Sequence, residues 1–336
     1  MADKMRACVL RNPGPLSGNP LAIENVAVPT PGAGEVLLKV LACGVCRTDL
    51  HIAMGELPQR LNPLIQGHQI VGEVVDANGS EHPVGTRVGV SWVGGTDGSC
   101  RYCLTGRENL CDHPAFTGYT RNGGFAEYAT TRADFLLPIP EKLSDIAAAP
   151  LLCAGIIGFR SLRVAEVKRS QCVGLFGFGS SAQLMLKVLH AWDCGVYVST
   201  RGEAHRELAR QLGAKWVGSE TDVPPDLLDA AITFAPSGDV VVAALRSIAK
   251  GGIVAINAIH LDRIPQFDYD TLLWEERSLR SVANMTRQDG HDFLRVAAEI
   301  GLTPSVQTFP LEQANDALRI IYDDKSSSSV VLLPHS

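Results

Sequence analysis

From about residue 165 the sequence alternates between short apolar runs and amphipathic segments, and this alternation constrains the fold more than any other feature. The apolar runs are too short for core helices, and they are rich in the β-branched residues typical of buried strands. The predicted strands cover residues 171–176, 196–200, 228–233, 252–257 and 279–283. The helices predicted between them include residues 182–191, 203–212 and 240–249. Strands that alternate with helices predict an α/β doubly wound parallel sheet.

The first 150 residues follow a different pattern. Strand-like runs at 36–42, 70–76, 87–92 and 125–130 are separated by Gly- and Pro-rich turns, with one short predicted helix at 46–54. This pattern predicts a mainly β body. The tail returns to strand, helix and strand. Since 336 residues suit two cores, we expect a β domain of residues 1–150 and 302–336, and a second domain of residues 151–301.

Composition narrows the classes of partner. The net charge is -6 and Lys and Arg form no block, which argues against nucleic acid. We see no apolar run of the roughly 20 residues that cross a membrane and no signal-peptide core at the start, so we expect a cytoplasmic protein without a membrane partner. The nine cysteines are an odd number. In a cytoplasmic protein they indicate metal binding or catalysis more than disulfides.

Two short segments carry preferred zinc ligands. Cys46 lies in the segment 44–51, and His68 follows Gly67. A catalytic zinc has three protein ligands and one open position, so a third ligand is needed. Cys153 lies at the junction of the two predicted domains, where it could reach the site from the hinge. Taken alone, Cys153 is more typical of a small buried core residue.

A second cluster contains Cys100, Cys103 and Cys111, with Asp97 three positions before the first cysteine. Structural zinc sites are closed by four ligands, and a carboxylate oxygen can be one of them. We therefore predict a structural zinc site, in which the metal is either held by Asp97 and three thiolates or bound only weakly. The alternative is a loop without metal, which would leave three oxidisable thiols.

A glycine-rich turn follows the first predicted strand of the second domain. Gly177 suits a tight turn, and Gly179 lets the backbone approach a pyrophosphate. Phe178, Ser180 and Ser181 complete this turn, and the amides at the start of the next helix would face the phosphates. The pattern predicts a dinucleotide site. By itself it also fits a simple strand-to-helix turn.

The end of the next strand indicates which dinucleotide is preferred. NAD enzymes usually carry an acidic residue there, bonded to the ribose. This chain has Thr200 and Arg201 instead. A hydroxyl and a guanidinium suit a 2′-phosphate, so NADP(H) is favoured over NAD(H). The alternative is that Arg201 only covers the adenine of NAD.

Taken together, these segments resemble the zinc-dependent alcohol dehydrogenases of the medium-chain dehydrogenase/reductase superfamily. The segments 44–51, 67–68, 100–111, 123–128, 152–155 and 177–179 carry the resemblance. It implies a GroES-like β catalytic domain, a Rossmann cofactor domain and an active-site cleft between them. It also implies that Cys46, His68 and Cys153 bind the catalytic zinc. This Cys2His set is the one established for alcohol dehydrogenases, so the assignment rests on that precedent.

The resemblance also implies roles around the metal. Thr48 matches the hydroxyl that contacts the substrate oxygen, and His51 matches the outer member of a proton relay. Asp49 matches the carboxylate that orients the zinc-binding histidine. Gln69 replaces the family's glutamate and removes a negative charge beside the metal. A basic residue such as Arg47 often contacts the cofactor phosphate.

The implied reaction is reversible hydride transfer between NAD(P)(H) and an alcohol or its aldehyde or ketone, with two zinc ions per chain. The candidate pocket residues Ala53, Leu57, Trp92 and Tyr119 favour medium-chain or aromatic substrates, although each also fits plain core packing. We expect a homo-oligomer, either a dimer or a tetramer. Two rival functions remain. One is an enone or quinone reductase of the same superfamily, and the other is a catalytically silent redox sensor.

Overall fold

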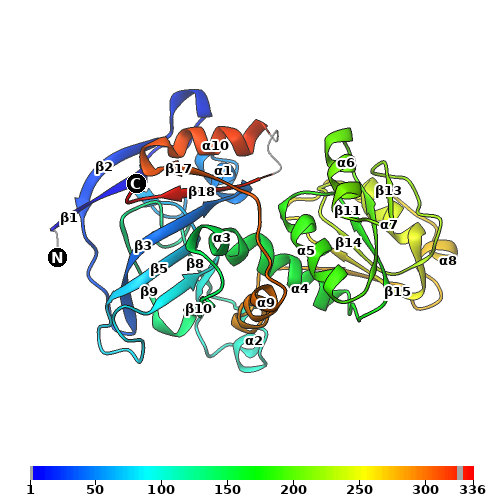
Figure 1. The fold of residues 1–336 in the computed structure, drawn as a ribbon, viewed down its shortest axis with the longest axis horizontal. Coiled ribbons are helices and arrows are strands. Elements are labelled where there is room, and N and C mark those ends of the chain that lie inside the picture. The colour runs from blue at the N-terminus through cyan, green and yellow to red at the C-terminus, as the bar shows by residue number, and fades with distance from the viewer. Residues whose placement is uncertain (1–2, 324–327) are drawn as a thin grey trace. The chain divides into compact units, whose positions relative to one another are not determined.

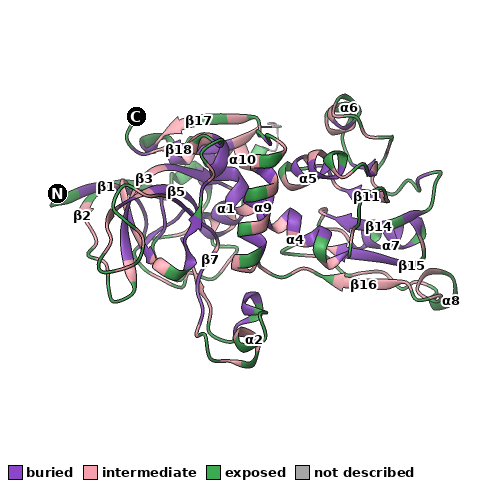
Figure 2. Ribbon diagram, turned by 60° about the horizontal axis from the view of Figure 1, so that its bottom comes forward, coloured by how far each residue is buried: buried purple, intermediate pink, exposed green. Residues whose placement is uncertain are grey.

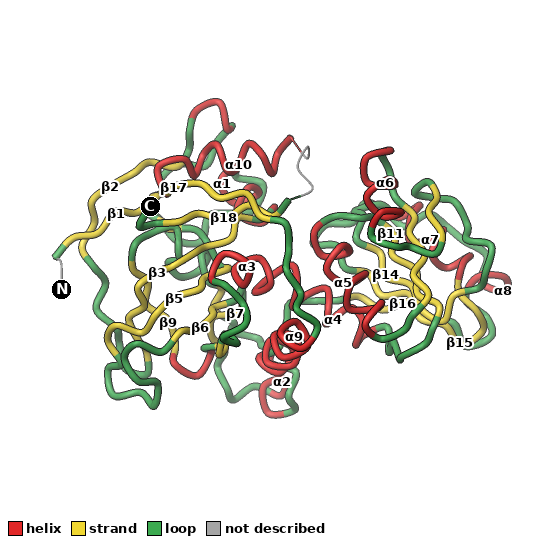
Figure 3. Tube along the Cα trace, viewed as in Figure 1, coloured by secondary structure: helices red, strands yellow, loops and turns green. Residues whose placement is uncertain are grey.

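The computed structural model describes residues 3–323 and 328–336 (Figure 1). The chain forms two compact units, the first made of residues 1–153 and 284–336 and the second of residues 154–283. Strands dominate the first unit, whereas the second alternates strands and helices (Figure 3). Both predicted fold types are therefore present.

Strand β3 (Glu35–Val45) is the centre of the first unit. It pairs antiparallel with three neighbours, and most of its residues are buried (Figure 2). In spatial order, the larger sheet of the described residues consists of β10 (Leu137–Pro138), β6 (Arg87–Val90), β5 (Gln69–Asp76), β3, β18 (Ser329–Leu333) and β17 (Val306–Pro310), with β9 (Tyr128–Arg132) also on β3. The smaller sheets are β2 (Leu21–Ala27), β1 (Lys4–Leu10) and β4 (Leu64–Ile65), and the pair β7 (Val93–Gly95) and β8 (Ala115–Phe116).

The helices of this unit are short. They are α1 (Arg47–Met54), α2 (Arg101–Leu104), α3 (Asp145–Pro150), α9 (Arg287–Glu299) and α10 (Ala314–Asp323). Helix α10 packs against α1 and β18, so the end of the chain contributes to the same core as the first sheet. The predicted helix at 46–54 is confirmed as α1. In the structure β17, α10 and β18, which form the tail, belong to the first unit.

The second unit is built on a parallel sheet whose strands follow the order third, second, first, fourth, fifth and sixth along the chain. This is the strand order of a dinucleotide-binding fold. The strands are β13 (Trp216–Gly218), β12 (Gly195–Ser199), β11 (Cys172–Phe176), β14 (Leu228–Thr233), β15 (Ile248–Ile256) and β16 (Ser278–Ser281). The helices are α4 (Ile156–Val164), α5 (Ser180–Ala191), α6 (Glu203–Gln211), α7 (Gly238–Ser247) and α8 (Tyr269–Leu272).

The second domain boundary differs from the expected position. The chain returns to the first unit at Asn284, not at residue 302. Helix α9 belongs to the first unit because its N-terminal end is bonded there. Arg287 donates from Nη2 to Glu108 Oε2 at 2.7 Å, and Asn284 donates to the Asn109 carbonyl at 3.0 Å. The partners in these hydrogen bonds lie far apart in the sequence, so the local sequence pattern could not predict the contacts.

Among the described residues, the helical stretch Asp145–Val164 has the length and apolar composition that would be needed to cross a membrane. It comprises α3, a π-helical turn at Leu151–Gly155 and α4. Its most apolar window is 67% buried within the protein. Core packing explains its apolar character, because a buried helix is apolar all round.

Candidate active site and metal sites

The start of α1 fixes the first predicted ligand. Cys46 is the N-cap residue, and its sulfur accepts the N–H of Thr48 at 3.4 Å. In return, the Asp49 carboxylate accepts the N–H of Cys46 at 2.9 Å, which completes a capping box. The cap that starts the helix therefore orients the Cys46 sulfur and places Asp49 in the interior.

Asp49 also connects to the second ligand. It is fully buried, and its Oδ1 accepts the N–H of Gly67 at 3.3 Å. The same oxygen lies 3.3 Å from Nδ1 of His68, close enough for an ion pair but outside hydrogen-bond geometry. The other ring nitrogen, Nε2, lies 3.3 Å from the sulfur of Cys46. Asp49 thus lies where a carboxylate would orient a metal-binding imidazole.

Cys153 joins these two side chains from the π-helical turn. The ligand atoms of Cys46, His68 and Cys153 all lie within 4.8 Å of one another. Bond lengths of about 2.3 Å for Zn–S and 2.0 Å for Zn–N require ligand atoms roughly 3.5 Å apart. The donor types and their spacing, with Nε2 of His68 beside the Cys46 sulfur, fit a zinc ion.

The protonation of these groups fits the same conclusion. A hydrogen bond from Cys153 and the nearby His68 hold the pKa of Cys46 well below its usual value. Burial opposes the charged form of His68, but the charges of Asp49 and Cys46 raise its pKa well above the usual value. The lowered pKa favours the thiolate form of Cys46, which is the form of cysteine that binds zinc.

The predicted relay residues lie on α1. Thr48 is buried in the first turn, and His51 follows one turn later on the same side of the helix. His51 contacts the carboxylate of Glu56 through Nδ1. Arg47, the first residue of α1, is exposed.

Aromatic side chains pack beside His68, one of the candidate metal ligands. The ring of Trp92 meets that of His68 edge-on at a centroid distance of 5.2 Å. On its faces, Trp92 stacks with Phe116 at 4.8 Å and with Tyr119 at 5.8 Å. The Tyr119 hydroxyl donates to the Pro58 carbonyl at 2.8 Å, which fixes this end of the stack. Two predicted pocket residues therefore lie together near His68.

The other two predicted pocket residues differ in burial. Ala53 is fully buried in the core of the first unit, so the structure gives no exposed surface at this position. Leu57 is partly buried and packs against the same core.

Gln69 is buried at the start of β5, opposite Gly44 of β3. A side chain at Gly44 would meet Gln69 Cδ at 2.9 Å, so the glutamine fills the space above the glycine.

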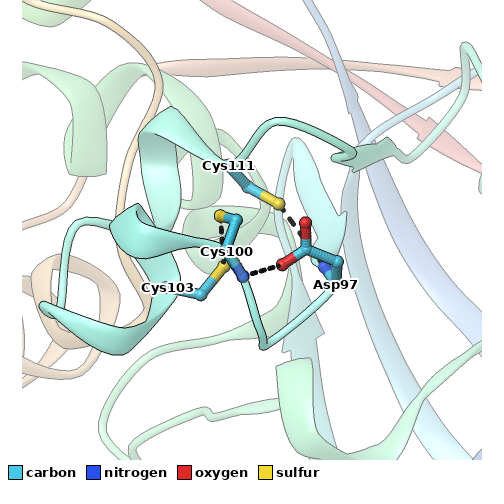
Figure 4. Close-up of side chains that lie close together, drawn as sticks. All are labelled: Asp97, Cys100, Cys103 and Cys111. Atoms are coloured by element: carbon cyan, nitrogen blue, oxygen red, sulfur yellow. Dashed lines mark hydrogen bonds between the residues drawn. The ribbon is translucent and has the colours of Figure 1, made fainter.

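The second cluster forms a small lobe around α2 (Figure 4). The ligand atoms of Asp97, Cys100, Cys103 and Cys111 lie within 4.8 Å of one another. One oxygen of Asp97 accepts the N–H groups of Ser99 and Cys100, both at 2.9 Å. These two hydrogen bonds hold the pKa of Asp97 well below its usual value. Asp97 is therefore an anion in a fixed orientation, directed toward the three sulfurs.

The lobe is attached to α9. Glu108, which is buried, binds Arg287 with both oxygens and also accepts the backbone N–H of Arg287 at 2.7 Å. The guanidinium of Arg287 lies 4.5 Å from the centre of the Phe135 ring. A paired carboxylate and guanidinium in this geometry fix orientation as well as distance.

The glycine-rich turn of the second unit joins β11 to α5. Gly177 has φ of +93°, and a Cβ there would meet the backbone N of Ala235 at 2.9 Å. Gly179 is the N-cap of α5, and no side chain caps this end. A Cβ at Gly179 would meet no protein atom within 4 Å. The free space and the uncapped amides of α5 fit a pyrophosphate group.

The predicted specificity residues follow β12. Thr200 is buried, and its carbonyl accepts Nη1 of Arg206 at 3.3 Å. Arg201 is exposed, and no ion pair to it is found within residues 3–323 and 328–336. Arg206 is paired with Glu203. At this edge of the sheet Arg201 is thus a cation that the described carboxylates leave unneutralised.

Comparison with known proteins decides the family. Residues 32–141 match the model of the alcohol dehydrogenase GroES-like domain. The chain is 44% identical to the probable alcohol dehydrogenase AdhA of Mycobacterium tuberculosis (strain CDC 1551 / Oshkosh), over 98% of this chain and 97% of the relative. It belongs to the alcohol dehydrogenase family. An alcohol dehydrogenase of Geobacillus stearothermophilus is 35% identical, over 93% of this chain and 96% of the relative.

A solved structure agrees with this alcohol dehydrogenase fold. The CAD structure from Helicobacter pylori, complexed with NADP(H), has a TM-score of 0.87 at 19% identity, over 100% of this chain and 99% of the other. The protein is a zinc-type medium-chain alcohol dehydrogenase, an oxidoreductase that uses a nicotinamide cofactor and acts on small alcohols or their carbonyl products. The resemblance inferred from the sequence is confirmed, and the rival reductase and sensor functions are disfavoured.

Three residues of this alcohol dehydrogenase were not singled out by the sequence. Phe116 completes the aromatic stack beside Trp92. Gln66 is fully buried and donates from Nε2 to the Asp49 carbonyl at 3.0 Å. Glu56 contacts His51. Only Glu56 had a sequence signal, because Gly55 before it is a typical helix end from which the chain turns back.

Proposed function

We propose that this alcohol dehydrogenase binds its catalytic zinc through Cys46, His68 and Cys153. The convergence of these three donor atoms within 4.8 Å carries the proposal. It is supported by the buried Asp49 beside His68 Nδ1. When bound there, zinc supplies a Lewis acid that stabilises the charge on the reacting oxygen of the substrate. Cys153→Ser should lower zinc content by one ion per chain and abolish turnover, as measured by metal analysis and by NADPH formation.

In this function the side chains of α1 move the hydroxyl proton. Thr48 accepts it from the substrate alcohol, and it passes by way of the cofactor ribose to His51, which transfers it toward solvent. The hydride moves separately to the nicotinamide. Their positions one turn apart on α1 support this pairing. His51→Gln and Thr48→Ala should each lower kcat for alcohol oxidation by about 10²–10⁴-fold. Wild-type kcat in both variants would contradict the relay.

We propose NADP(H) as the preferred cofactor, which makes reduction of aldehydes the expected cellular direction. Exposed Arg201 beside Thr200, without an acid at the end of β12, supports this preference. Arg201→Ala should weaken binding of NADPH far more than that of NADH, measured by fluorescence titration. Arg246→Ala, an exposed arginine in α7, is the matched control. Equal losses for both cofactors would contradict the 2′-phosphate role.

The substrates we propose are medium-chain or aromatic alcohols and aldehydes. The stack of Phe116, Trp92 and Tyr119 beside His68 supports this choice, because it places apolar aromatic side chains next to a proposed zinc ligand. We expect kcat/KM for hexanol and benzyl alcohol to exceed that for ethanol. A higher value for ethanol would contradict the proposal.

We also propose a second, structural zinc in the lobe, bound by Asp97, Cys100, Cys103 and Cys111. The proximity of these four ligand atoms supports it. Assembly as a dimer or tetramer and a cytoplasmic location stay predictions, which light scattering and fractionation would test.

A further inference from the structure

The chain reverses sharply where α1 ends. Gly55 is the C-cap residue in a left-handed conformation with φ of 80°, and its N–H bonds to the carbonyls of His51 and Ile52. The N–H of Glu56 then bonds to the His51 carbonyl at 2.9 Å. This is the usual hydrogen-bonded end of a helix with glycine. It returns the backbone of Glu56 to the last turn, beside His51.

The side chains meet as a result of this reversal. A carboxylate oxygen of Glu56 contacts Nδ1 of His51. The His51 side chain is 20% exposed and that of Glu56 is 50% exposed, so Glu56 is the member of the pair that is more open to solvent. The Glu56 carboxylate accepts a hydrogen bond from the Nδ1–H of His51. This contact fixes the orientation of the ring and leaves Nε2 as the nitrogen that faces away from Glu56. An imidazole bound in this way is oriented and gains a neighbouring negative charge.

We propose that Glu56 is a positioning residue of the proton relay, which holds the His51 ring in place while the proton passes from His51 to water. This inference rests on the proposed relay role of His51. In alcohol oxidation the C–H bond breaks with its electron pair going to the nicotinamide of NAD(P)⁺, and the hydroxyl proton leaves separately. That proton arrives on His51, becomes paired with the Glu56 carboxylate, and passes to water or to a buffer base. In carbonyl reduction the same proton travels inward.

A purely structural pair would behave differently. A protonated histidine near a helix C-terminus is stabilised by the helix dipole, and an exposed ion pair adds little stability. Loss of such a pair would lower stability slightly and leave the rate of proton release unchanged. If the pair belongs to the relay, removing the Glu56 carboxylate slows proton release from His51. An external base can then take the place of the carboxylate and restore the rate.

The test compares Glu56→Gln, Glu56→Asp, His51→Gln and the double variant with the wild type, using alcohol oxidation with NADP⁺ at constant pH and ionic strength. Glu299→Gln is the matched control, since Glu299 is exposed at the end of α9. We expect Glu56→Gln to lower kcat roughly 10-fold with KM values little changed, less than the loss from removing the imidazole. Glu56→Asp should recover part of this loss.

Two readouts separate the relay from a structural role. Added imidazole buffer should raise kcat of Glu56→Gln more than that of the wild type. The double variant should be no slower than His51→Gln, since residues that act in one chain are not additive. The inference is overturned if Glu56→Gln matches Glu299→Gln, if buffer has no effect, or if the two losses multiply. Wild-type kcat in His51→Gln would instead refute the relay itself.

Discussion

Asp49→Asn tests how strongly the buried carboxylate supports the metal site. Asp49 accepts two backbone N–H groups on separate oxygens, that of Cys46 at 2.9 Å and that of Gly67 at 3.3 Å. Asparagine has nearly the same shape but only one acceptor oxygen. One of these N–H groups would therefore face an NH2 group, and His68 would lose its negative neighbour.

The expected magnitude follows from these contacts. A buried N–H without a partner costs about 1–3 kcal/mol of folding stability. Removing the group that orients a metal-binding histidine costs about 10–100-fold in metal affinity, which corresponds to about 1.4–2.8 kcal/mol. We expect Asp49→Asn to remain folded, with a lower midpoint in chemical denaturation and weaker zinc binding at one site only.

The assay is competition for zinc with a chelator of known affinity, followed by metal analysis and kcat on the same samples. The lobe at Asp97 is an internal control, since Asp49 has no contact there among the hydrogen bonds and ion pairs of the described residues. Asp239→Asn, at an exposed position in α7, controls for the chemical change. Wild-type zinc affinity and kcat in Asp49→Asn would refute the reasoning.

Two further predictions concern the first unit. Asp97→Asn keeps an oxygen for the N–H groups of Ser99 and Cys100 but removes the anionic ligand. Zinc content should therefore fall toward one ion per chain and Tm should drop, whereas Asp97→Cys should retain two ions. An unchanged zinc content in Asp97→Asn would contradict the ligand assignment. Burial opposes ionisation of Glu127, but bonds from Arg6 hold its pKa below the usual value. This carboxylate therefore stabilises the fold above the unfolded pKa of about 4.3 and loses that contribution as pH falls through its lower folded pKa. Denaturation midpoints should thus fall less between pH 5 and about pH 3 in Glu127→Gln than in the wild type, and parallel curves would contradict this.

Much of the second unit could be predicted from the sequence because its pattern is local. Five of its strands are apolar runs between helices, and the alternation predicts a doubly wound parallel sheet. The order of the strands in that sheet came from the structure. β13 was missed, since Trp216–Gly218 is too short for any periodicity. The residues of α9 were assigned to the second domain with the rest of 151–301, whereas the structure has them in the first unit. The position of this helix depends on Glu108 binding Arg287, which lies 179 residues further along the chain.

The candidate site divides in the same way. Cys46 and His68 could be proposed from residue type alone, and the capping box around Cys46 is a local feature. Cys153 could be added only through the family resemblance, because its contact with Cys46 depends on the tertiary fold. Phe116 and Glu56 needed the structure, since ring stacking and a helix-end reversal place them beside Trp92 and His51.

The central claim is that a metal held by Cys46, His68 and Cys153 is required for alcohol oxidation. The most direct measurement is stepwise removal of zinc from the wild type and from Asp97→Asn, with metal content and NADPH formation from benzyl alcohol followed together. In Asp97→Asn the remaining zinc should be the catalytic one, so activity should fall in proportion to zinc lost and return when zinc is added. Full activity in a chain that has lost this zinc would contradict the account.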